Sequence, residues 1–167
     1  TEIHFYRSSN LKDWTASSRF GAAHGSHGGV WECPELIQLN IEGSDETRWV
    51  LFVSVGNGAP AGGSGVQYFV GQFDGITFTP QDVPDRFRWA DYGADFYAPQ
   101  AWNDAPNGRR LCIAWMNNWA YANQIPASTW RGAMSLPREL ALLRDSDGDG
   151  DGDDVVLVQR PLPELRQ

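Results

Sequence analysis

The apolar residues of this chain come in short, often alternating runs, and no segment keeps a helical period for long. The runs end at turn signals such as Gly56-Asn57-Gly58, Asp74-Gly75 and Asn107-Gly108. The content of 8 Trp and 18 Gly with only 20% charged residues also suits strands and tight turns better than helix bundles. The pattern therefore predicts an all-β fold. Strands are expected at Ile3–Arg7, Leu36–Leu39, Trp49–Val55, Val66–Gln72, Leu111–Met116 and Val155–Gln159, and with less regular patterns at Ala98–Asn103, Ala133–Leu136 and Glu139–Leu143.

One aromatic spacing occurs twice along the chain. Phe5 precedes Trp14 by the same distance as Phe69 precedes Phe78, and each pair encloses a polar turn. A strand–hairpin–strand unit that repeats in this way is typical of the blades of a β-propeller.

The formal net charge of −8 and the pI of about 4.7 argue against nucleic acid and anionic membranes as partners. The same balance suits a neutral, hydroxyl-rich ligand such as a sugar.

The two cysteines, Cys33 and Cys112, form no CxxC pair, which disfavours zinc, and their spacing does not demand a disulfide. We expect one domain over residues 1–167 and no cofactor.

The segment Asp145–Asp154 is an acidic run of Gly and Asp. Asp145, Asp147 and Asp149 match the start of a calcium-binding loop, but Val156 stands where such a loop needs a bidentate Glu. We therefore expect a solvated hairpin loop within the domain and no metal site.

Glu32 stands between Trp31 and Cys33, with Pro34 next. A carboxyl beside an indole and a thiol is expected to be partly desolvated, and desolvation makes a carboxyl a better proton donor near neutral pH. The residues alone leave two interpretations open: a catalytic proton donor, or a glutamate on an edge strand beside a core tryptophan.

Several longer blocks resemble glycoside hydrolase family 32, and the levanase and exo-inulinase branch more than the plant invertases. These blocks are Ser9–Trp14, His24–Leu36, Asp91–Trp102, Ile113–Trp119, Tyr121–Pro126 and Trp130–Leu140. The resemblance implies a partial five-bladed β-propeller, of about three blades of four-stranded antiparallel sheets, from the central to C-terminal part of the catalytic propeller. The match around Trp31–Leu36 and Trp115–Trp119 disfavours a relative that cleaves arabinan.

The resemblance also implies cleavage of β-fructofuranosyl bonds with retention, with Glu32 as the general acid/base and Cys33 tuning it. Glu35 departs from the Asp that usually follows the Pro in the family. The W-M-N-D-P-N-G and R-D-P elements, which carry the nucleophile and a third acid, do not occur in these 167 residues. We therefore expect the chain to be a piece of a longer protein and to be inactive when isolated. The alternative is a non-catalytic carbohydrate-binding or assembly module, which could pair with the missing half or another copy through open edge strands.

By the same resemblance, Trp31, Cys33, Asp95, Tyr97 and Trp119 are expected to line the sugar site, although structural roles remain open for them. The expected partner is a fructose-containing oligo- or polysaccharide, and the expected location is extracellular or periplasmic. His24 and His27 are expected to hold the loop before Glu32. The run Trp102–Gly108 looks like the nucleophile element with an insertion, but its Asn, Asp, Pro and Gly suit a hairpin turn, so Asp104 is not expected to be catalytic.

Overall fold

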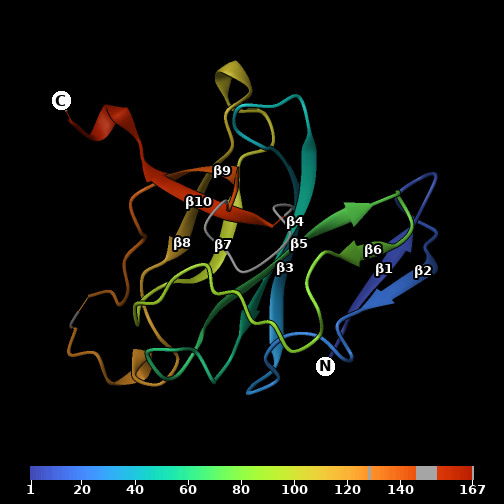
Figure 1. Ribbon diagram of the computed structural model, residues 1–167. Helices are drawn as coiled ribbons and strands as arrows, with labels where there is room; N and C mark the ends of the chain where they lie inside the picture. The colour runs from blue at the N-terminus through green and yellow to red at the C-terminus, as the bar shows by residue number, and fades with distance from the viewer. Residues whose placement is uncertain (128, 146–153, 167) are drawn as a thin grey trace.

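The computed structural model describes residues 1–127, 129–145 and 154–166, and it is built from strands and short 3-10 turns (Figure 1). The strands are β1 (Ile3–Arg7), β2 (Thr15–Phe20), β3 (Trp31–Asn40), β4 (Thr47–Val55), β5 (Gly65–Phe73), β6 (Phe78–Pro80), β7 (Tyr97–Ala101), β8 (Leu111–Trp115), β9 (Arg138–Arg144) and β10 (Val155–Pro161). The 3-10 turns are η1 (Pro106–Gly108), η2 (Ala122–Gln124) and η3 (Pro163–Arg166). None of the helical turns in the described ranges has the length or the apolar character needed to cross a bilayer.

The strands in the described ranges form three antiparallel sheets, in agreement with the propeller expectation. Two are four-stranded meanders, β3-β4-β5-β6 and β7-β8-β9-β10, and the third is the two-stranded sheet β1-β2. The all-β prediction is confirmed, and the first blade contributes two strands within this chain. The prediction of a strand at Ala133–Leu136 is wrong: in the described residues this segment makes an isolated bridge between Met134 and Trp115, and its apolar side chains Met134 and Leu136 gain no burial that would favour a longer ladder.

The repeated aromatic spacing marks the same structural unit twice. Phe5 lies in β1 and Phe69 in β5, and each strand pairs with the strand that follows it, β2 and β6 respectively. Because β5-β6 is the outer half of a four-stranded sheet, the β1-β2 hairpin corresponds to the outer half of the preceding sheet.

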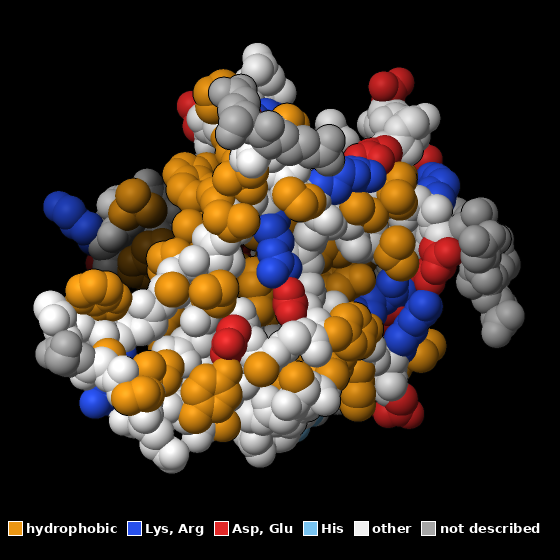
Figure 2. Space-filling view, turned by 90° about the vertical axis from the view of Figure 1, so that its left-hand side faces the viewer, with side chains coloured by type: hydrophobic (Ala, Val, Ile, Leu, Met, Phe, Trp, Pro, Cys, Tyr) orange, Lys and Arg blue, Asp and Glu red, His pale blue; other side chains and the backbone are white. Residues whose placement is uncertain are grey.

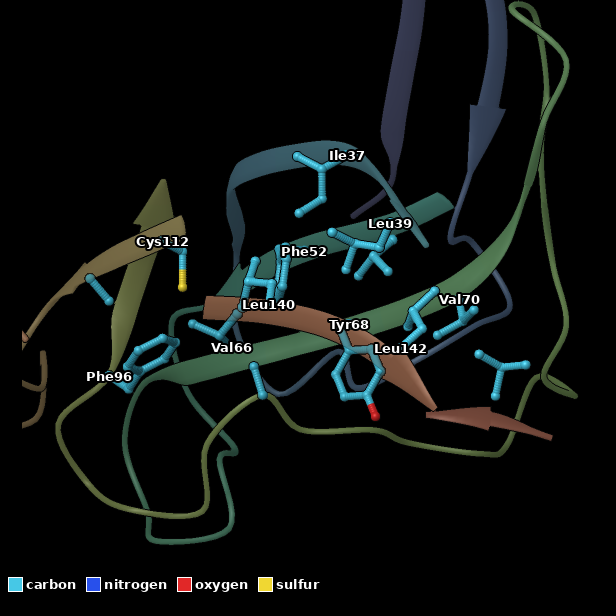
Figure 3. Close-up of a cluster of buried hydrophobic side chains, with 14 of the residues drawn as sticks. Ile37, Leu39, Phe52, Val66, Tyr68, Val70, Phe96, Cys112, Leu140 and Leu142 are labelled. Atoms are coloured by element: carbon cyan, nitrogen blue, oxygen red, sulfur yellow. The ribbon is translucent and has the colours of Figure 1, made fainter. Parts of the chain in front are cut away.

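Two apolar clusters hold the sheets together. The first fills the space between the two four-stranded sheets, where Leu39, Phe52 and Val70 meet Leu140 and Leu142 (Figure 3). The second joins the other face of the β3–β6 sheet to the β1-β2 hairpin and includes Trp31, Phe69 and Phe20. Complete burial of each such side chain stabilises the fold by about 1.5–3 kcal/mol.

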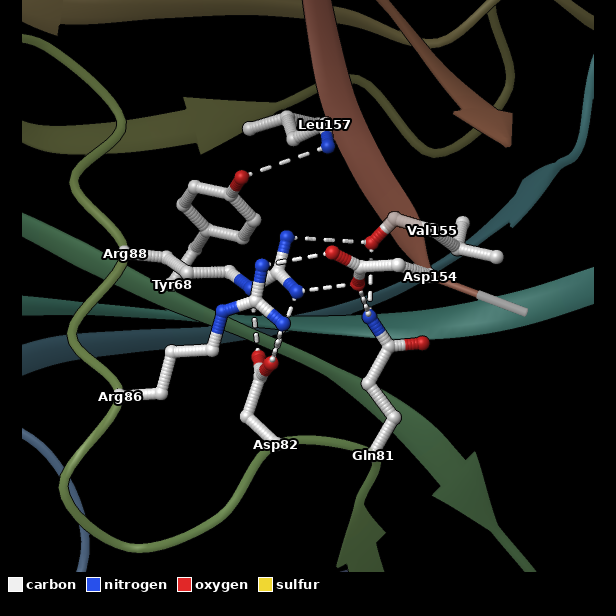
Figure 4. A network of polar contacts seen from close by, with 8 residues as sticks. All are labelled: Tyr68, Gln81, Asp82, Arg86, Arg88, Asp154, Val155 and Leu157. Carbon is white, nitrogen blue, oxygen red and sulfur yellow. Dashed lines mark hydrogen bonds and ion pairs between the residues drawn. The ribbon is translucent and has the colours of Figure 1, made fainter. Parts of the chain in front are cut away.

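A buried ionic network joins the two four-stranded sheets at one point. Arg88, in the connection between them, donates two hydrogen bonds to Asp82 and also pairs with Asp154, just before β10 (Figure 4). The half-exposed Arg86 side chain forms an ion pair with the Asp154 carboxylate, with 2.6 Å between nitrogen and oxygen. The Gln81 side chain donates to the Val155 carbonyl at 2.7 Å. The start of β10 is thereby fixed against the neighbouring sheet.

Beyond the paired ends of β9 and β10, the amide of Asp145 donates to the Asp154 carbonyl at 2.8 Å. Asp147 and Asp149, the other calcium candidates, lie outside the described residues.

The side of the molecule that carries β8 displays many hydrophobic side chains around a few charged ones (Figure 2). Large exposed hydrophobic residues follow β8 in the chain: Met116, Trp119, Trp130, Met134 and Leu136.

Candidate active site

The first strands of the two four-stranded sheets lie beside each other, and their starting residues form the candidate site. Glu32 stands near the start of β3, and Tyr97 begins β7. The Tyr97 hydroxyl donates a hydrogen bond of 2.5 Å to Oε2 of Glu32. The carboxyl therefore has one oxygen engaged by the protein, on a side chain that is otherwise exposed.

A break in the pairing of β3 presents Glu32 to solvent. The β3–β4 register shifts between Glu32 and Glu35, and Cys33 has a positive φ of 45°. Such an irregularity redirects a strand and its side chains locally. The Cys33 thiol lies on the exposed stretch, where partial burial and then the negative charge of Glu32 raise its pKa.

Trp31 occupies the opposite face of β3 and does not cover Glu32. Its side chain is buried in the second apolar cluster, and its indole Nε1 donates to the Ser26 carbonyl at 2.7 Å. The expected contact between carboxyl and indole is absent because successive side chains of a strand point to opposite faces. His27 stacks on Trp31 with ring centroids 4.8 Å apart and donates to the Gly21 carbonyl at 3.0 Å. His27 thus holds the loop before Glu32, as predicted.

Three aromatic rings form a wall beside the carboxyl. Tyr97 packs edge-on against Trp115 and Trp119, with centroids 6.2 and 6.5 Å away, and the two indoles lie 4.9 Å apart. Trp119 is half exposed. Three effects raise the pKa of Tyr97: burial is the largest, and the hydrogen bond to Glu32 and the negative charge of Glu32 add to it. Tyr97 therefore remains a hydrogen-bond donor throughout the neutral pH range.

Asn118 holds the exposed Trp119 in place and was not singled out by sequence reasoning. Its buried side chain accepts from the Ser64 amide at 3.1 Å and donates to the Ala94 carbonyl at 2.8 Å. The Ser64 hydroxyl in turn accepts from the Trp119 amide at 3.0 Å. A single buried amide thus joins three loops, a role that only the surrounding carbonyl and amide groups reveal.

Asp95 lies two residues before Tyr97 and lines a neighbouring groove of about 430 Å³ that also includes Met116 and Arg138. Its carboxylate accepts a hydrogen bond from the hydroxyl of Tyr121.

Asp104 lies elsewhere, in the turn between β7 and β8 and ahead of η1. The Asn, Asp, Pro and Gly of this segment predicted such a turn.

A family model described as "Glycosyl hydrolases family 32 N-terminal domain" matches residues 1–161. The chain belongs to glycosyl hydrolase family 32. Among curated members of this family, the chain is 52% identical over 166 residues to a levanase of Bacillus subtilis, covering 98% of this chain and 24% of that protein. It is 46% identical over 152 residues to an extracellular exo-inulinase of Aspergillus niger, covering 84% of this chain and 28% of that protein. The chain thus spans about a quarter of the length of these family 32 relatives.

Solved structures of family 32 enzymes share the fold. A fructofuranosidase from Schwanniomyces occidentalis, complexed with fructose, superimposes with a TM-score of 0.87 at 41% identity over 98% of this chain and 31% of that one. An exo-inulinase from Aspergillus awamori gives a TM-score of 0.85 at 41% identity over 96% of this chain and 31% of that one. These matches place the three sheets of this chain as part of a family 32 propeller.

Proposed function

We propose that this chain is part of an extracellular glycoside hydrolase that cleaves β-fructofuranosyl bonds of levan, inulin or sucrose with retention. The observation that carries the proposal is the exposed Glu32 carboxyl, held by the Tyr97 hydroxyl beside an aromatic wall. Family membership and relatives named as a levanase and an extracellular exo-inulinase support the substrate class and the location.

In this mechanism Glu32 is the general acid/base. Because Oε2 accepts the Tyr97 hydrogen bond, the exchangeable proton resides on Oε1, the oxygen left free for the substrate. Glu32 protonates the leaving glycosidic oxygen while a second carboxylate attacks the anomeric carbon. Deprotonated Glu32 then takes a proton from the water that releases the fructosyl group.

The second carboxylate is proposed to come from outside these 167 residues, since the family's W-M-N-D-P-N-G element does not occur in them. Retention requires it about 5–5.5 Å from Glu32. Trp119, Cys33 and Asp95 are proposed to border the sugar, and Trp31 to position the strand that carries Glu32 rather than to touch the substrate.

The test replaces Glu32 by Gln in the longer protein that carries this chain. Loss of general acid catalysis is expected to lower kcat on sucrose and inulin by about 10²–10⁴-fold. Release of reducing sugar measures the rate, and NMR of the first-formed anomer reports retention. Glu46→Gln is the matched control, because Glu46 is exposed on the surface and its described ion-pair partners are Arg48 and Arg144. Equal rates for Glu32→Gln and the control would contradict the proposal.

A second candidate is a non-catalytic carbohydrate-binding or assembly module. One observation favours it: within the described residues β1 pairs only with β2, so its other edge is open to a strand of another copy or of a missing half. Binding of fructose oligomers that survives Glu32→Gln, with no turnover when the upstream half is supplied, would select this alternative.

A further inference from the structure

Among the described strands β7 is the edge strand of its sheet, so part of its backbone has no neighbouring strand there to pair with. Buried backbone amides require acceptors, and here side chains of the other four-stranded sheet supply them. The Ala98 amide donates to the Ser54 hydroxyl at 3.0 Å. The Ala101 amide lies between the two carboxylate oxygens of Glu35, at 2.9 Å from each.

These two contacts follow the hydrogen bond between Tyr97 and Glu32 along β7. Ala98 follows Tyr97 directly, and Glu35 lies just beyond the break in β3 that exposes Glu32. Ala98 has a positive φ of 49°, a conformation that costs about 1–3 kcal/mol and persists only when its surroundings hold it. β3 and β7 are therefore both irregular where they lie side by side. The side chains that connect them set the distance between the two strands.

Glu35 has no other described hydrogen bond, and the carboxylate is half-buried between the sheets. Burial raises the pKa of Glu35, and the Ala101 amide acts against this by favouring the charged form. Burial of a carboxylate is costly, but an ionised acceptor makes a stronger hydrogen bond to a backbone amide than a neutral side chain does.

We propose that Glu35 is a positioning residue for the general acid/base, acting through the Ala101 amide to keep the Tyr97 hydroxyl on Glu32. The inference rests on the proposed function. Glu35 sets the distance between β3 and β7, and a displacement of about 1 Å in a reacting group costs up to about 10²-fold in rate. The effect falls on proton donation to the leaving oxygen, the step that Glu32 performs.

The experiment uses the longer active protein and two substrates. Sucrose has a poor leaving group that needs a proton, whereas 4-nitrophenyl β-D-fructofuranoside releases an anion that does not. Glu35→Gln keeps the shape of the side chain and one acceptor oxygen, but it removes the negative charge and replaces the second oxygen by an NH2 group that cannot accept from Ala101. We expect kcat/KM on sucrose to fall about tenfold, with the nitrophenyl substrate within about twofold of the unsubstituted protein.

A double-mutant cycle tests whether Glu35 acts through Tyr97. If it does, adding Glu35→Gln to Tyr97→Phe lowers the sucrose rate no further, because the hydroxyl that it positions is already gone. Glu139→Gln is the matched control, because it weakens a half-buried ion pair with Arg109 at a position distant in sequence from Glu35. It should lower stability and change the rates on sucrose and on the nitrophenyl substrate to the same extent.

Glu35→Asp provides a second probe that keeps the charge but withdraws the carboxylate by about 1.5 Å, and it should show the same selective loss to a smaller degree. Thermal unfolding of each variant identifies any loss that follows from misfolding. Equal losses on both substrates, additive effects with Tyr97→Phe, or unchanged rates in both Glu35 variants would each overturn the inference. Failure of the proposed function looks different, because the unsubstituted protein would then cleave none of levan, inulin and sucrose.

Discussion

Arg88 is the residue whose replacement should most clearly destabilise this fold. Its side chain is 7% exposed and donates to Asp82 at 2.6 and 2.7 Å, while the Asp82 and Asp154 side chains are only 4% and 11% exposed. Arg88→Met removes the cation but leaves both carboxylates buried. Removal of one partner from a buried ion pair costs about 3–5 kcal/mol, which lowers the folding equilibrium constant by about two to four orders of magnitude.

Arg86→Met is the matched control for this substitution. Arg86 contacts the same two carboxylates, at 3.4 and 2.6 Å, but its side chain is 48% exposed. Pairs of this kind contribute about 0–1 kcal/mol, because water screens them and the long side chain loses entropy. The two substitutions therefore change the same formal charge and differ mainly in burial.

Urea unfolding of the 167-residue chain, followed by tryptophan fluorescence, measures both free energies. The midpoint should fall for Arg88→Met with an unchanged slope, since the surface exposed on unfolding stays the same. In an Asp154→Asn background, Arg88→Met should cost less, because one of the stranded charges is gone. A cost for Arg88→Met no larger than that for Arg86→Met would refute this reasoning about burial.

Three further outcomes are expected. Burial raises the pKa of Asp154, but hydrogen bonds from Arg88 and Arg86 outweigh it and hold this pKa below the usual 3.8. The ionised carboxylate therefore stabilises the fold above pH 3.8, and stability should decline as the pH falls below about 4. Urea unfolding midpoints measured across pH check this. Gly63→Ala should destabilise the fold by more than about 1 kcal/mol, because a Cβ would lie 2.1 Å from Oδ1 of Asn118 at a φ of +66°; thermal unfolding checks this, with the unobstructed Gly62 as the control. A thiol reagent should label the exposed Cys33 alone in the native chain and both thiols after unfolding, since burial raises the pKa of Cys112 to about 11; rapid native labelling of two thiols would contradict the structure.

The local sequence was enough to predict the class of fold and the main candidate residue. Short alternating runs ended by Gly and Asn turns determine strands, because period-two burial and turn conformations depend on near neighbours in the chain. Glu32 could be singled out from its immediate context and from the resemblance carried by the blocks around it. The repeated aromatic spacing identified the β1-β2 and β5-β6 hairpins as equivalent units.

Contacts between sheets were decided only by the tertiary structure. The hydroxyl that holds Glu32 comes from Tyr97, 65 residues away, and the acceptor for the Ala101 amide comes from Glu35, at a separation of 66 residues. The buried orientation of Trp31 depends on which face of β3 packs against the β1-β2 hairpin. Sequence patterns specify which residues alternate, but the packing of one sheet on another decides which side chains meet, because that choice depends on register and burial across the whole domain.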